Sequence, residues 1–119
     1  RLTSIGGKFS DLEITTDDTF SILMSATKCN VVSVHLNYLD QIKQRIITIN
    51  GNNGTITVDL VGNSARFNET EVKFSVSADD SYTAQHLAMI ATDSQNICTL
   101  SEAMKVIDTI KAIETAAKK

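Results

Sequence analysis

Few side chains in this sequence could carry out chemistry. It contains only two histidines, His35 and His86, and neither stands in a recognisable metal-binding or nucleophile motif. His35 shares a face of its predicted strand with Ser33 and Asn37, so we expect it to hydrogen-bond a partner chain or a ligand. His86 follows Tyr82 by one turn of a predicted helix, and we expect it to pack among apolar neighbours. We therefore predict no catalytic residue.

Charged residues and thiols leave further alternatives open. Arg45 is the only basic residue within an apolar run, and a partly buried guanidinium needs a carboxylate or phosphate partner, from the protein or from a nucleotide-sugar. The acidic cluster at residues 11–18 fits a solvated turn as well as an acid–base pair. Cys29 and Cys98 lie far apart in different predicted elements, which favours two buried free thiols over a disulfide or a metal site.

The glycines do not form a phosphate-binding loop. Gly51 and Gly54 lie in a predicted hairpin, and Gly6-Gly7 is not followed by helical periodicity. We therefore expect the chain to bind neither a dinucleotide cofactor nor a metal ion by itself.

Composition indicates an ordinary globular protein. With 119 residues, 42% of them hydrophobic and 21% charged, the chain fits one domain over residues 1–119. The net charge of -3 and the lack of a dense basic patch argue against nucleic acid. No apolar stretch is long enough to span a membrane and no secretion signal is visible, so we expect the cytoplasm. A start at Arg1 instead of Met suggests an excised fragment.

Hydrophobic periodicity changes once, near residue 80. Before that point apolar residues alternate as in half-buried strands, and after it they follow helical spacing. The expected strands are 18–27, 32–38, 45–49 (a central strand), 55–60 and 72–76, with a hairpin turn at Asn50–Gly54. The expected helices are 81–91, anchored by Leu87, Met89 and Ile90, and one that starts at the capping box Thr99-Leu100-Ser101-Glu102.

These elements predict an α+β fold, in which a mostly antiparallel open sheet of five to six strands carries two C-terminal helices on one face. The outward strand positions are mainly Ser, Thr, Asn and one His, with little Lys or Glu. Such a face costs little to desolvate, so we expect a homodimer formed sheet to sheet.

Three segments in order resemble the glucose-fructose oxidoreductase and inositol dehydrogenase (Gfo/Idh/MocA) family. The first is SDLEI at 10–14 with DDT at 17–19. The second is VSVHLNYL at 32–39, continued by Arg45, Gly51, Gly54 and Asp59. The third is Tyr82 with NICTLSEAMKV at 96–106. Together they span nearly the whole chain.

The resemblance implies the C-terminal, substrate-side domain of a dehydrogenase whose N-terminal Rossmann domain binds NAD or NADP. The family's catalytic Lys and His motifs would lie before Arg1, so the chain alone should not turn over substrate. The most similar subgroup acts on amino sugars or nucleotide sugars, and by that resemblance His35, Tyr38 and Arg45 would anchor a sugar-type substrate. In place of the subgroup's Tyr-Leu-Gln-Arg-Pro stretch this sequence has Tyr38-Leu39-Asp40-Gln41-Ile42.

Two other functions are compatible with the same pattern. A free-standing binding or dimerisation module could hold a small apolar ligand in the concavity of a curved sheet, but it would need a closed pocket. A small hydrolase is a more distant alternative, because no nucleophile has an adjacent base in the sequence.

Overall fold

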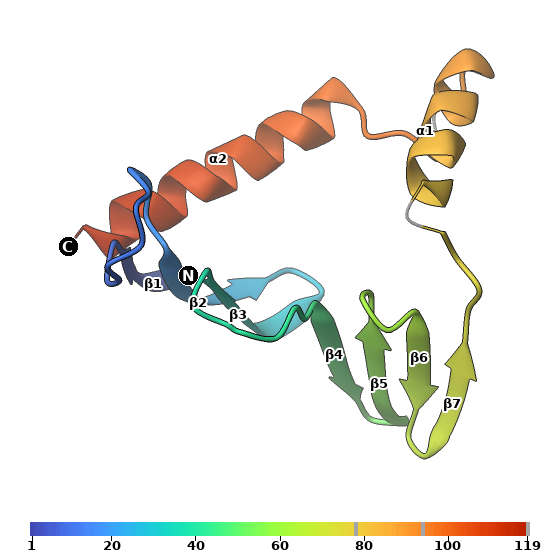
Figure 1. Cartoon of the computed structure of the whole chain (residues 1–119), viewed down its shortest axis with the longest axis horizontal. Coiled ribbons are helices and arrows are strands. Elements are labelled where there is room, and N and C mark those ends of the chain that lie inside the picture. The colour runs from blue at the N-terminus through green and yellow to red at the C-terminus, as the bar shows by residue number, and fades with distance from the viewer. Residues whose placement is uncertain (78, 94, 119) are drawn as a thin grey trace. The chain divides into compact units, whose positions relative to one another are not determined.

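In the described part of the chain, seven antiparallel strands and two C-terminal helices form an α+β structure in two compact units (Figure 1). The computed structural model describes residues 1–77, 79–93 and 95–118. The first unit comprises Arg1–Asp40 with Cys98–Lys119, and the second comprises Gln41–Ile97. The predicted α+β class is confirmed, but the strands belong to two sheets instead of one. The prediction of a single domain stays a prediction.

The first sheet has the order β1-β2-β3 and holds the core of the first unit. Its strands are β1 (Leu2–Gly7), β2 (Thr19–Ala26) and β3 (Cys29–Asn37). Ser4, Ile22 and Val34 lie side by side across the three strands, so they share one face. Ile22 is only 7% exposed and is the one buried hydrophobic residue in the described chain. The apolar alternation of β2 and β3 thus points inward as predicted.

Helix α2 (Leu100–Ala117) covers this inner face and lies against β1. Its start is fixed by the predicted capping box, in which the Thr99 hydroxyl accepts from the N–H of Glu102 and the Glu102 carboxylate accepts from the N–H of Thr99 at 2.9 Å. Near its end the carbonyl of Ile113 accepts a 2.6 Å hydrogen bond from the buried hydroxyl of Ser4. One polar contact therefore joins the helix to the core of the sheet.

A buried carboxylate shapes the loop between β1 and β2. Asp18 is only 2% exposed, and its oxygens accept hydrogen bonds from the N–H groups of Phe9 and Ser10 and from the hydroxyls of Ser10 and Thr19. The ammonium of Lys8 lies 3.6 Å from the same carboxylate. The Ser10 hydroxyl is the largest cause that lowers the pKa of Asp18 far below its ordinary value, and together with the other hydrogen bonds it outweighs burial, which raises the pKa.

The second sheet has the order β4-β5-β6-β7 and one strongly apolar face. Its strands are β4 (Ile46–Gly51), β5 (Gly54–Asp59), β6 (Ser64–Phe67) and β7 (Thr70–Lys73). The register places seven apolar residues on one face: Ile47, Ile49, Ile56, Val58, Ala65, Phe67 and Val72. None of them is buried. The strand predicted at 45–49 to be central, β4, is an edge strand of this sheet.

The predicted hairpin at Asn50–Gly54 is present, and one glycine carries its unusual backbone. Gly51 pairs with Gly54 across the turn, and Gly54 has φ +146°. A Cβ atom on Gly54 would lie 2.6 Å from the side-chain oxygen of Asn68, which accepts a hydrogen bond from the N–H of Thr55. Gly54 therefore permits both the turn and the close approach of β6.

Helix α1 (Asp80–Ile90) lies in the second unit and buries none of its residues. The sequence predicted that Leu87, Met89 and Ile90 anchor it and that both helices cover one sheet face. The expectation about the anchors is wrong, because all three are exposed. Within the second unit α1 packs on none of the described strands, whereas α2 packs on β1 in the first unit. A helix period fixes which residues share a face, but it does not supply the surface that covers them.

We expect Thr99→Ala to destabilise the first unit by about 1 kcal/mol, the usual cost of losing an N-cap hydroxyl. Urea unfolding followed by circular dichroism would measure it. Thr109→Ala is the matched control, because the Thr109 hydroxyl bonds only the Lys105 carbonyl within α2 and Ala favours helix. Equal destabilisation by both substitutions would contradict the role of the cap.

Asp18→Asn should lower the urea midpoint at pH 7 and reduce its dependence on pH. The pKa of Asp18 in the folded chain lies below its ordinary value of 3.8. The ionised carboxylate therefore stabilises the folded chain above about pH 4, and this stabilisation is lost as the pH falls toward the folded pKa. Urea midpoints between pH 7 and pH 2.5 would measure the difference. Asp17→Asn is the control. Because Asp17 is exposed, this substitution should leave the urea midpoints and their dependence on pH as in the wild type.

Candidate functional site

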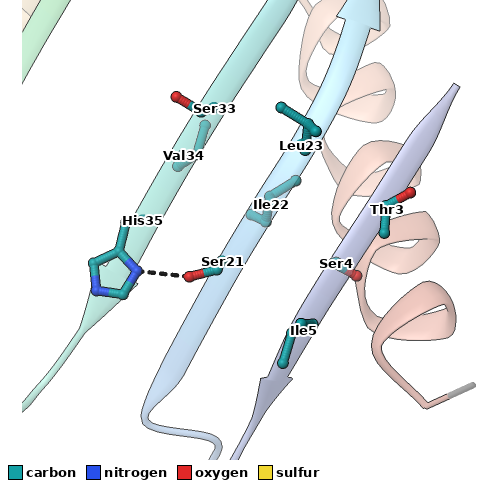
Figure 2. Close-up of a pocket in the computed structure, with 9 residues that line it drawn as sticks. All are labelled: Thr3, Ser4, Ile5, Ser21, Ile22, Leu23, Ser33, Val34 and His35. Carbon is teal, nitrogen blue, oxygen red and sulfur yellow. Dashed lines mark hydrogen bonds between the residues drawn. The ribbon is translucent and has the colours of Figure 1, made fainter.

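On the face of the first sheet opposite α2, the side chains of Ser21, His35 and Asn37 interact with one another. Ser21 on β2 and His35 on β3 are directly paired in the register, and the Ser21 hydroxyl oxygen lies 2.8 Å from Nδ1 of His35 (Figure 2). The Asn37 side-chain amide nitrogen lies 3.1 Å from Nε2 of the same ring. His35 therefore has a polar partner on each ring nitrogen.

A shallow depression of about 330 Å³ surrounds the Ser21–His35 pair on the open face. All three strands line it, with the residues Thr3, Ser4, Ile5, Ser21, Ile22, Leu23, Ser33, Val34 and His35. Ile5 and Leu23 are 70% and 55% exposed on this face. The depression thus combines hydroxyl and imidazole groups with two uncovered aliphatic side chains.

Tyr38 and Arg45 do not join His35 in this depression. Tyr38 follows β3 directly, its N–H donates to the Asp18 carbonyl at 2.9 Å, and its ring is exposed. Arg45 precedes β4 in the second unit and is exposed, whereas the sequence predicted a partly buried guanidinium. Arg45 directly precedes β4, an edge strand with a neighbouring strand on one side only, which explains why its guanidinium is exposed. Substrate binding by these three residues stays a prediction.

Two further expectations about reactive side chains are wrong. Cys29 and Cys98 are free as predicted, but both are exposed. His86 is exposed on α1 instead of packed among apolar residues. Cys29 begins the edge strand β3, Cys98 lies in the connection before α2, and α1 has no covering partner in the described structure, so none of these three residues is packed in a core.

The Ser21–His35 pair was not predicted, and it depends on a bulge in the hairpin between β2 and β3. The turn at Thr27 and Lys28 joins β2 to β3, and partners across this hairpin have residue numbers that add up to 56 beyond the bulge near Ala26. Counting outward from that turn alone, which pairs Ala26 with Cys29, would place Ser21 opposite Val34. The bulge between Met24 and Ala26 shifts the register by one residue and brings Ser21 opposite His35. The contribution of Ile5 was not predicted either, because β1 was not predicted as a strand.

The described residues do not fit a dinucleotide cofactor. A pyrophosphate binds where a glycine-rich turn opens a helix. Each helix here begins instead with its own carboxylate: Asp80 accepts from the N–H of Ser77 at 2.8 Å, and Glu102 accepts from the N–H of Thr99. A phosphate at either end would face a negative charge. These bonds also lower the pKa of Asp80, through the Ser77 hydroxyl first, and that of Glu102, through the Thr99 N–H first.

The described chain offers no candidate metal site and no membrane-spanning helix. No group of three or more His, Cys, Asp or Glu residues there could hold a metal ion. Neither of its helices is long and apolar enough to cross a membrane. No protein-family model, characterised protein or solved structure matches the chain.

Proposed function

We propose that this chain is the substrate-binding and dimerisation part of an NAD(P)-dependent sugar or nucleotide-sugar dehydrogenase, inactive by itself and located in the cytoplasm. The observation that carries the proposal is the uncovered face of the first sheet, which has exposed apolar residues and no charged side chain at its paired positions. The ordered resemblance of residues 10–19, 32–59 and 82–106 to the Gfo/Idh/MocA family supplies the reaction class.

The paired part of the open face carries no charged side chain. The register places nine residues on it, and none is Asp, Glu, Lys or Arg: Thr3, Ile5, Gly7, Thr19, Ser21, Leu23, Ser33, His35 and Asn37. Charge lies at the end of the strands, where the N-terminal ammonium of Arg1 donates a hydrogen bond to the Ser25 hydroxyl. The cores of protein interfaces are likewise depleted in charged residues. A solvated sheet face commonly carries Lys and Glu, so this composition supports contact with a second protein surface.

The apolar residues of this face would provide the driving force for assembly. Ile5 on β1, Leu23 on β2 and Val31 on β3 are 70%, 55% and 71% exposed. Covering apolar surface stabilises a complex by roughly 25 cal/mol per Å². The simplest closed arrangement is a twofold homodimer in which the same face meets itself.

The size of the face limits how strong such a dimer would be. Three strands about 4.8 Å apart and up to nine residues long, with a rise of about 3.3 Å per residue, outline roughly 400 Å². A stable complex commonly buries about 800 Å² on each partner. We therefore propose a weak dimer for the isolated chain and a larger interface in the full protein.

The polar centre of the face suits a sugar-type ligand or a polar contact across the dimer. Ser21, Ser33 and His35 offer hydrogen-bonding groups in the shallow depression. Sugar hydroxyls both donate and accept hydrogen bonds, which matches such groups. In this proposal His35, Tyr38 and Arg45 anchor the substrate.

A separate Rossmann domain would bind NAD or NADP, since the described residues provide no suitable loop. The alternative of a stand-alone module for an apolar ligand has less support. The depression beside His35 is shallow, whereas that function requires an enclosed pocket.

The isolated chain should dimerise weakly, and Leu23→Lys should weaken the dimer at least tenfold. In a twofold interface the substitution places two ammonium groups near each other and buries both. Light scattering across a range of concentrations would measure the dissociation constant. Val106→Lys is the control, because Val106 on α2 is 57% exposed and lies outside the open face. A chain that stays monomeric, or a dimer that tolerates Leu23→Lys, would contradict the proposed assembly.

NADH should not bind the isolated chain, since both helix starts carry carboxylates. A fluorescence titration of NADH with the purified chain should show no saturable change. Saturable binding in the micromolar range would refute the separation of substrate and cofactor parts.

A further inference from the structure

The geometry points to a positioning role for Asn37: it holds His35 in the tautomer with the proton on Nδ1, so that Ser21 acts as a hydrogen-bond donor and not as a nucleophile. This inference deepens the proposed function. Only the kind of group that Ser21 would bind rests on that proposed function. The tautomer itself follows from four hydrogen bonds at the end of β3.

The orientation of the Asn37 amide is the first step. Its Oδ1 atom accepts hydrogen bonds from the backbone N–H groups of Leu39 and Asp40, each at 2.8 Å. A backbone N–H can only donate, so the oxygen must face these two groups. The amide NH₂ group then points toward Nε2 of His35, at 3.1 Å.

The orientation of Asn37 decides the tautomer of His35. An amide NH₂ only donates, so Nε2 must accept and carries no proton in the neutral ring. The proton then lies on Nδ1 and is donated to the Ser21 hydroxyl oxygen, 2.8 Å away. Serine thus accepts from histidine, which is the reverse of the direction in a catalytic serine–histidine pair.

The hydrogen of the Ser21 hydroxyl is consequently left for another acceptor. Ser21 has no acceptor for it within the described structure. A carbonyl, carboxylate or hydroxyl oxygen resting in the depression between Ile5 and Leu23 would receive that hydrogen. We therefore assign Ser21 to the recognition of an oxygen acceptor on whatever occupies the open face.

The test is nitrogen NMR of the two histidine rings in the whole chain, at a pH where both are neutral. The chain has only two histidines, and His86→Gln assigns the signals. We expect the proton-bearing nitrogen of His35 to be Nδ1, whereas exposed His86 should show the Nε2–H form that histidine favours in water. A His35 ring with its proton on Nε2 would overturn the inference.

Two variants separate the contributions of Asn37 and Ser21. Asn37→Asp keeps an oxygen for the Leu39 and Asp40 N–H groups but places an acceptor at Nε2, so the two ring signals of His35 should exchange types. Ser21→Ala should keep the Nδ1–H form, because Asn37 remains. If Ser21→Ala moves the proton to Nε2, Ser21 and not Asn37 holds the tautomer, and the inference fails. The wild type and Ser21→Ala decide the question even if Asn37→Asp does not fold.

Reactivity supplies an independent readout. A fluorophosphonate probe labels serines whose proton is removed by an adjacent base. We expect no labelling of Ser21 in the wild-type chain, and labelling would refute its assignment as a donor. The NMR and light-scattering tests can fail separately. A monomeric chain with the His35 proton on Nδ1 would rule out the proposed dimer alone. A dimer with that proton on Nε2 would rule out only this inference.

Discussion

The scarcity of buried apolar surface governs this structure. The chain exposes 10,240 Å². Two separate folded units sharing its 12.9 kDa would together expose only about 7,600 Å² by the usual scaling of surface with mass. Uncovered apolar residues lie on the open face of the first sheet, on one face of the second and along α1. A chain with these properties is suited to association, because contact with a partner supplies the burial that its own fold lacks.

Polar contacts secure the first unit where apolar burial is small. Asp18 gathers the donors of the loop after β1, the Ser4 hydroxyl reaches the end of α2, and Thr99 with Glu102 fixes its beginning. Hydrogen bonds are directional, so they define one arrangement even when their net free energies are modest. The open face can then stay free of a covering layer without losing its register.

Local patterns allowed prediction of most of the described elements, but not of β1 and β6, and not of what surrounds each element. The alternation in β2 and β3, the turn before Gly54 and the capping box at Thr99 are properties of a few neighbouring residues, and the structure shows all three. Strand β1 was missed because LTSIGG is short and includes two glycines, and its buried Ser4 reads as a surface residue. The exposure of Arg45 depends on which strand lies beside β4, which no local pattern encodes.

The candidate site illustrates why proximity alone does not identify a function. A serine oxygen 2.8 Å from a histidine nitrogen has the spacing of a catalytic pair, and that distance alone would favour the hydrolase alternative. The turn that ends β3 reverses this reading, because Asn37 must direct its oxygen to two backbone N–H groups and its NH₂ to the ring. A backbone requirement outside the depression thus fixes the direction of the Ser21–His35 bond within it. The direction of that bond, and not its length, favours a binding surface over a nucleophile.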